Sequence, residues 1–386
     1  MLPNLVTAAD LHLIIPEVFV CAAAFGLLMV SAAGLVTLYL GLELLALSSY
    51  GLVGMDRDNK VASEAAMKYF ILGSMASGLL LYGMSMVYGA TGSLQFDEIY
   101  AASAAAGNDT LLALGVVFML VGVAFKFGAA PFHMWLPDVY QGAPTAITAF
   151  IGSAPKLAYF GMAYRLLESG VGPLDADWRV MLAWLAAASL VVGNVIALAQ
   201  VNFKRLLAYS TISHVGFLFM GLANATAMGY AAAMFYALSY ALMGAAAFAA
   251  IILLSRRGFE AERIADFRGL WKTHPGHALL VLFIMASLAG VPPFLGFWAK
   301  LVVIGAALDA GMTWLAVLSV VCAVLGAFYY LRIIRAMFFE EPEGDGAQVH
   351  PDSHLRVAFA LNAGALLVLG LFAQPLLGWC QAAFPG

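Results

Sequence analysis

Six ionisable side chains lie inside long apolar runs of this sequence, where charge is otherwise rare. They are one acid, four lysines and one histidine: Glu43, Lys68, Lys126, Lys156, Lys300 and His214. A charge at the centre of a membrane-spanning helix costs about 2.5–3.5 kcal/mol on insertion scales, so it normally faces protein or water and marks an ion path. Burial disfavours the charged form of a lysine, whereas a nearby carboxylate favours it. A change in the distance between the two could therefore make the lysine bind or release a proton. The six residues therefore predict a series of proton-holding groups.

Each of these residues also has a purely structural interpretation. Lys68 could extend its amine toward the surface or pair with Glu64, four residues earlier on the same helix. His214 could be a core histidine with satisfied hydrogen bonds. For Glu43 and the other three lysines the alternative is a structural ion pair, which is a costly way to secure packing when several separate charges are involved.

The first of two interrupted apolar runs covers residues 110–141 and carries Lys126. One glycine and two prolines follow that lysine: Gly128, Pro131 and Pro137. These residues predict a break in the helix at membrane depth. His133 and Asp138 lie in the break, where they could orient waters or merely cap the second half-helix.

The second interrupted run covers residues 276–309. It contains Gly290, Pro292 and Pro293, and Lys300 follows them. The two breaks read alike, as GxxPFxxW in the first run and GxxPFxxxW in the second. Two interrupted spans at corresponding places in two halves of a chain point to a transporter built from repeats.

Composition identifies the class of protein that must position these residues. Of the 386 residues 63% are hydrophobic and 10% are charged, with a mean hydropathy of +0.93, which predicts an all-α polytopic membrane protein. The three cysteines, Cys21, Cys322 and Cys380, are far apart and form no CxxC, which argues against a cysteine-bound iron–sulfur cluster or structural zinc in this chain. There is no nucleotide-binding glycine motif and no basic tract for nucleic acid. Any redox cofactor is therefore expected in a partner, and the lipid bilayer is the expected environment.

Eleven apolar runs have spanning length. They lie at 11–30, 33–54, 64–89, 110–141, 145–168, 178–200, 206–223, 226–254, 276–309, 313–338 and 355–380. The first ten divide into two five-helix repeats, 1–170 and 171–340, each with its broken helix fourth. Because five is odd, the second repeat is inverted. Residues 341–386 then supply a loop and one further helix, and a short helix is expected around residues 260–271.

The basic residues of the short loops predict the orientation. Arg57, Lys204, Arg256 and Arg332 illustrate a pattern in which lysine and arginine follow the even-numbered runs, whereas the loops after the odd-numbered runs are acidic. The positive-inside rule then places the N-terminus in the cytoplasm and the C-terminus in the periplasm.

Five stretches carry a resemblance to a known family. They are LYLGLELLALSSYGLVG, EAAMKYFILGSMASGLLLYGM, FKFGAAPFHMWLPDVYQGAPT, NFKRLLAYSTISHVGFL and SLAGVPPFLGFWAKL. At these stretches, which are specific as a set, the chain closely resembles the antiporter-like membrane subunits of respiratory complex I, the NADH–quinone oxidoreductase, and within them the subunit N group. The resemblance covers most of the chain from about residue 16 onward.

The resemblance implies a proton-pumping membrane-arm subunit of a bacterial inner membrane, part of a translocase. It implies that Glu43 pairs with Lys68 or Lys126, that Lys126 and Lys156 belong to a central relay, and that Lys300 is the terminal lysine. It also implies that NADH, FMN, iron–sulfur clusters and quinone are bound by partner subunits and that other membrane subunits of complex I surround the chain. The alternatives are a subunit of a multi-subunit sodium/proton antiporter, a subunit of a hydrogenase-type complex, and an inert structural subunit of the membrane arm.

Overall fold

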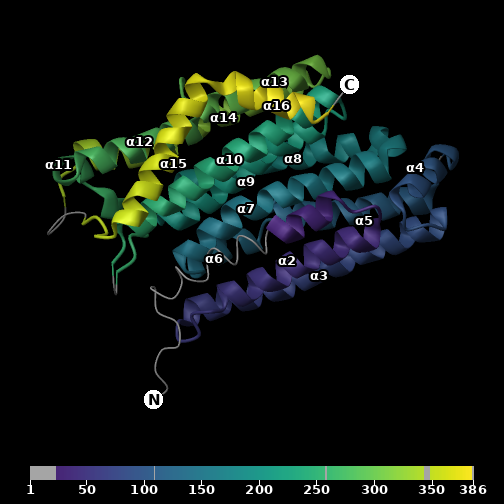
Figure 1. Ribbon diagram of the computed structural model, residues 1–386, viewed down its shortest axis with the longest axis horizontal. Helices are drawn as coiled ribbons and strands as arrows, with labels where there is room; N and C mark the ends of the chain where they lie inside the picture. Colours follow the sequence, from purple (N-terminus) through teal and green to yellow (C-terminus); the bar gives the residue numbers. More distant parts are fainter. Residues whose placement is uncertain (1–22, 108, 257–258, 343–347, 385–386) are drawn as a thin grey trace.

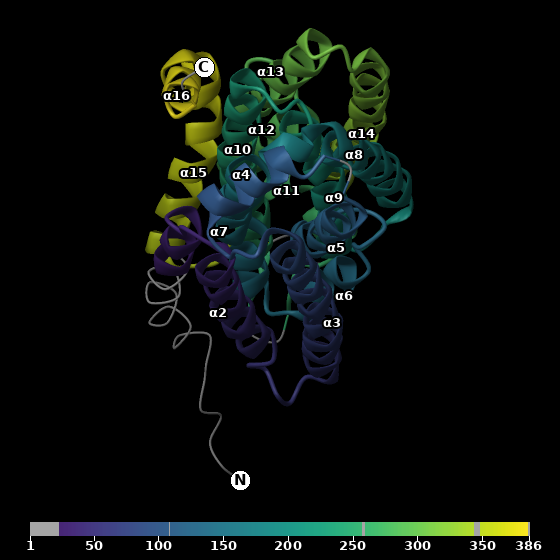
Figure 2. The same ribbon diagram turned by 90° about the vertical axis from the view of Figure 1, so that its right-hand side faces the viewer.

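The computed structural model describes residues 23–107, 109–256, 259–342 and 348–384. All regular elements in this part are helices, accompanied by three isolated β-bridges. The helices form one bundle whose members run mostly along its length, from α2 and α3 at one edge to α11–α16 at the other (Figures 1 and 2). Seven of the described helices are long and apolar enough to cross a membrane, counting the short turn that leads into one of them.

In the described part of the first half, the first helix covers residues 23–30. The chain continues with α2 (Leu35–Val53), α3 (Lys60–Thr91), α4 (Phe96–Ala105), α5 (Thr110–Phe127), α6 (Trp135–Gly142) and α7 (Thr145–Tyr164). A π-turn, Arg165–Gly170, and a 3-10 turn, Gly172–Leu174, end this half. Of the predicted first span 11–30, residues 11–22 lie outside the described residues, and so does Cys21.

The second half contains most of the remaining helices. They are α8 (Asp175–Ala199), α9 (Phe203–Leu222), α10 (Ala227–Leu254), α11 (Leu270–Thr273), α12 (Pro275–Ala289), α13 (Leu295–Asp309), α14 (Thr313–Phe339), α15 (Ser353–Leu371) and α16 (Ala373–Ala382). Helices therefore occupy every predicted span within the described part of the chain. The proposed division at residues 170 and 340 stays a prediction.

Both interrupted runs break at the glycine and proline residues, as the sequence predicted. Gly128 ends α5 with a φ of 77°, and Gly290 ends α12 with a φ of 84°. This left-handed conformation is open to glycine and costly for residues with a side chain. A Cβ at Gly128 would also lie 2.3 Å from Leu136 Cδ1. The chain resumes as α6 and α13, so each run is two half-helices joined by an irregular segment.

Three features differ from the sequence-based expectation. The run 355–380 is two helices, α15 and α16, because Pro375 cannot donate a backbone hydrogen bond and its ring clashes with the carbonyl four residues earlier. The expected short helix at 260–271 is a 3-10 turn, Ile264–Phe267, followed by the single turn α11. The acidic loop after the third run contains α4, which the spanning pattern did not reveal.

The core is centred on α7, α9 and α10, which lie between the two edges of the bundle (Figure 1). Every residue of α9 except Arg205 is buried. Glycines allow the closest helix crossings: a Cβ at Gly193 of α8 would lie 2.5 Å from the backbone nitrogen of Ser213. Aromatic rings fill the space between helices, as where Phe127 meets Phe219 with ring centres 5.2 Å apart.

Candidate functional site

Glu43 and Lys126 form an ion pair inside the first half. Lys126 Nζ lies 3.2 Å from Glu43 Oε1 and donates to Ser77 Oγ, also at 3.2 Å. Ser77 in turn donates to Glu43 Oε1 at 2.5 Å. The Lys126 side chain is 4% exposed and that of Glu43 19%. Three helices, α2, α3 and α5, thus contribute one polar residue each to a closed triangle.

The helices themselves favour this arrangement. Lys126 lies in the last turn of α5, two residues before the glycine that ends the helix, where the carbonyl dipoles stabilise a cation. Glu43 and Ser77 lie in the middle of α2 and of α3, so their polar atoms have no access to the loops. A buried ammonium needs both a counter-charge and hydrogen bonds, and the triangle supplies both.

Lys68 has different partners. Its Nζ lies 2.7 Å from Glu64 and 2.9 Å from Asp138, and its side chain is 43% exposed. Asp138 also binds Arg205, with 2.8 Å between Oδ1 and NH1. Of the two pairings that the resemblance left open for Glu43, the structure therefore contains the one with Lys126, while Lys68 joins an ion-pair chain across α3, α6 and α9.

Lys156 of α7 reaches the first break from the other side. Its Nζ donates to the carbonyl of Phe127, the last residue of α5, at 2.5 Å and lies 6.0 Å from the centre of the Trp135 ring. The side chain is fully enclosed, and among the described residues no carboxylate pairs with it. A carbonyl oxygen can accept from either an ammonium or a neutral amine, so this contact persists in both protonation states.

Lys300 of α13 repeats this arrangement at the second break. Its Nζ donates to the carbonyls of Leu288 and Ala289, both at 2.9 Å, which are the last two residues of α12. Phe217 covers it, with the ring centre 5.5 Å from Nζ. Each break thus has a buried lysine bound to the C-terminal carbonyls of its first half-helix.

His214 lies in a network of hydroxyl groups between the breaks. Its Nδ1 is 2.7 Å from the Tyr236 hydroxyl and its Nε2 is 3.2 Å from that of Tyr330. The ring of Tyr240 lies alongside, with centres 4.9 Å apart, and its hydroxyl is 2.6 Å from that of Thr211. Both nitrogens of His214 therefore have partners able to donate or accept a proton.

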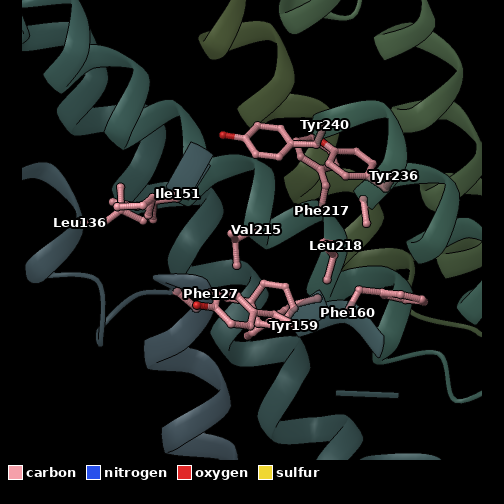
Figure 3. Packing of buried hydrophobic residues seen from close by; sticks show 14 of the residues in the cluster. Phe127, Leu136, Ile151, Tyr159, Phe160, Val215, Phe217, Leu218, Tyr236 and Tyr240 are labelled. Atoms are coloured by element: carbon pink, nitrogen blue, oxygen red, sulfur yellow. The ribbon is translucent and has the colours of Figure 1, made fainter. Parts of the chain in front are cut away.

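Two aliphatic residues of α9 follow His214, Val215 directly and Leu218 one turn later. In Figure 3, Val215 and Leu218 of α9 lie between the rings of Phe127 and Tyr159 on one side and those of Tyr236 and Tyr240 on the other. Both aliphatic side chains are 3% exposed.

Sequence reasoning missed several polar residues of the interior. Ser77 gave no signal, because one serine in an apolar run is common. Lys204 was counted only among the inner loop charges, yet its side chain is 1% exposed and contacts Glu260 and Glu262. His133, which was singled out, has its ring centre 6.5 Å from that of Tyr209, and its Nδ1 has no hydrogen-bond partner in the described part of the chain.

The family model described as NADH:quinone oxidoreductase/Mrp antiporter, TM, matches residues 32–326. The chain belongs to this family.

Relatives and solved structures agree with the family match. NADH-quinone oxidoreductase subunit N of Xanthomonas euvesicatoria pv. vesicatoria (strain 85-10) is 60% identical over 372 residues, covering 96% of this chain and 76% of the relative. A chain of respiratory complex I from Thermus thermophilus matches with a TM-score of 0.81 and 36% identity, covering 94% of this chain and 78% of that one. A chain of the Mrp complex from Dietzia sp. DQ12-45-1b matches with a TM-score of 0.82 and 27% identity, covering 95% and 77%. The chain thus has the antiporter-like membrane fold of this oxidoreductase/Mrp family.

Proposed function

We propose that this chain is a proton-translocating membrane-arm subunit of a bacterial NADH–quinone oxidoreductase. The observation that carries the proposal is the buried triangle of Glu43, Ser77 and Lys126 beside a broken span. Such a charge pair is an expensive way to hold helices together, and replacing it with apolar residues would often be neutral or stabilising. Its presence is better explained by a proton-binding role, and the relatives named subunit N support the choice of complex.

The proposed path runs through the candidate residues. Quinone chemistry elsewhere in the complex weakens the ion pair between Glu43 and Lys126, and Lys126 then releases its proton. The proton passes by way of Lys156 toward His214 and on to Lys300, with waters and tyrosine hydroxyls bridging the intervals. The lysine contacts support this path, because carbonyl acceptors allow Lys156 and Lys300 to gain and lose a proton without losing their hydrogen bonds.

The partners and placement follow from the same proposal. NADH, FMN, iron–sulfur clusters and quinone are bound by other subunits, and membrane subunits of the complex flank this chain. The chain lies in the inner membrane with its N-terminus in the cytoplasm and its C-terminus in the periplasm, as the basic loops indicate.

The test is proton uptake by inverted membrane vesicles, driven by NADH and sensitive to a quinone-site inhibitor. In Lys126→Ala we expect uptake to collapse while the assembled complex is present at the normal level. Lys272→Ala is the matched control, because that lysine is exposed and paired with Glu341 at the surface. Normal uptake and turnover in Lys126→Ala would show that the triangle is structural.

The second candidate is a subunit of a multi-subunit sodium/proton antiporter. The fold match to the Mrp complex favours it equally well on shape, although the sequence identity is lower than to the complex I chain. The two functions differ in their coupling. An antiporter subunit would move protons in response to a sodium gradient without NADH, whereas the proposed subunit would do so only during NADH oxidation.

A further inference from the structure

A buried lysine outside the proposed path holds two carboxylates at the end of the bundle that carries the basic loops. Lys204 Nζ, in the first turn of α9, donates to the carbonyl of Ala143 at 2.8 Å. It also lies 3.4 Å from Glu260 Oε1 and 3.6 Å from Glu262 Oε1. Both acids come from the segment between α10 and α11, and each is about one-third exposed. The cluster therefore connects the bundle interior with the aqueous phase.

The two carboxyl groups share one ammonium, since Lys204 Nζ is within 3.6 Å of an oxygen of each. Two ionised carboxylates gathered on one ammonium repel each other, which favours the uptake of one proton by the pair. With one proton bound, the cluster of two acids and one lysine is electrically neutral, whereas without it the cluster carries one negative charge. A partly buried site favours the neutral state.

The surroundings make the two acids unequal. Burial alone would raise the pKa of the Glu260 carboxyl. The nearby Lys204 ammonium and a hydrogen bond from Thr145 outweigh that effect, so the pKa lies below its usual value. Burial raises the pKa of Glu262, and the neighbouring Glu260 adds to the effect. A pair of acids separated in this way has one member that stays ionised and one that exchanges its proton closer to neutral pH.

Other nearby charges have partners of their own. Arg205 pairs with Asp138, the carboxylate of Asp266 accepts from the backbone of Arg263, and Arg256 donates to Gln348. Among the described residues, Lys204 is thus the basic group that contacts both acids.

Hydroxyl groups lead from this cluster into the core. Thr145 donates to Glu260, and one turn further along α7 the hydroxyl of Thr148 donates to the carbonyls of Tyr140 and Ala143. The Tyr140 hydroxyl is fully buried without a hydrogen bond from the described residues, and α6, which carries it, packs against α9, which carries Thr211 and His214. A buried hydroxyl in this state normally binds water.

The last step of this series reaches the histidine. Thr211 bonds to the Tyr240 hydroxyl, and the Tyr240 ring lies against His214. An orphan hydroxyl thus lies between the surface acids and the histidine network.

We propose that the carboxyl pair Glu260–Glu262, held by Lys204, is the group through which protons enter the second half of this protein from the cytoplasmic side. The inference rests on the proposed function and extends it. A proton from bulk water binds the pair and neutralises it, then passes along Thr145, Thr148, the Tyr140 hydroxyl with its water, and Thr211 to His214, leaving the pair free to take up the next proton. Lys204 is a positioning residue, because it keeps both acids together and does not move a proton itself.

The test uses the assembled complex in inverted vesicles, whose outer medium bathes the cytoplasmic side. Glu262→Gln keeps the size of the side chain and its contact with Asn202, but it cannot exchange a proton. Glu262→Asp keeps the exchangeable group and shortens the chain. We expect proton uptake per NADH oxidised to fall in the Gln variant and to be largely retained in the Asp variant. A structural role would give the reverse order and would overturn the proposal.

The pH dependence supplies a second readout. Since the pKa of Glu262 is raised, its protonated fraction falls as the pH of the medium rises through that pKa. Uptake by the native complex should therefore decline on the alkaline side, and Asp should preserve a decline that Gln abolishes. Glu341→Gln is the control, because its side chain is 79% exposed in an ion pair with Lys272.

Lys126→Ala measured alongside separates the two hypotheses. If Lys126→Ala abolishes uptake and Glu262→Gln leaves it unchanged, the entry site is wrong and the proposed function stands. If both variants pump normally, the proposed function fails with it.

Discussion

Replacing Glu43 with glutamine tests the central triangle most directly. The side chain keeps its size and its oxygen can still accept from Ser77 and Lys126, so the variant removes charge with little change in shape. At the observed 3.2 Å and an effective dielectric constant of about 20, the lost attraction is about 5 kcal/mol. Breaking a buried pair by removing one partner costs about 3–5 kcal/mol, which is of the same size.

Lys126 can avoid most of that cost by becoming a neutral amine. We therefore expect Glu43→Gln to assemble, to oxidise NADH more slowly, and to take up fewer protons per NADH in inverted vesicles. Fluorescence quenching of an acridine dye, calibrated against NADH absorbance, measures that ratio. Glu64→Gln removes an exposed carboxylate from Lys68 and serves as the control. An unchanged proton-to-NADH ratio in Glu43→Gln, with normal assembly, would refute the reasoning.

Two further outcomes follow from the structure. Gly193→Leu should prevent α8 from packing on α9, because even a Cβ would lie 2.5 Å from a backbone nitrogen. The amount of subunit in membranes should therefore drop sharply. Gly51→Leu is the control and should accumulate normally, because the space around its Cβ position is open. Lys300→Ala should abolish proton uptake by vesicles while activity staining of native gels shows an assembled complex. Lys300→Arg should also fail to take up protons, because arginine keeps a permanent positive charge. Full pumping in the Arg variant would show that the charge alone matters.

The sequence was informative where local chemistry decides the structure. Glycine and proline located both helix breaks, since their backbone limits hold in any environment. Mid-span charges such as Lys126 and Lys156 pointed to the interior because burying them is costly. The match of the apolar runs to the helices follows from the same principle, that a bilayer requires continuous helices.

The partner of Glu43 and the depth at which Lys204 is buried were harder to predict. Whether Glu43 meets Lys68 or Lys126 depends on how three helices rotate, which no spacing reveals. Lys204 sits at the start of a helix beside a loop, where lysines usually reach water, and only the fold shows that the loop before α11 closes over it. The break between α15 and α16 was hidden because apolar composition continues through Pro375.

The aliphatic side chains of Val215 and Leu218 have an electrical consequence under the proposed function. A conducting wire of hydroxyls and lysines across the membrane would short-circuit the potential that the complex builds, and each returning proton would waste about 2.3 kcal/mol per 100 mV. On the path proposed from Lys156 to His214, Val215 and Leu218 would interrupt proton transfer, because neither side chain can carry a proton. Under the proposed function we therefore expect a proton to cross this stretch only when water bridges the two side chains, which would make hydration the controlled step.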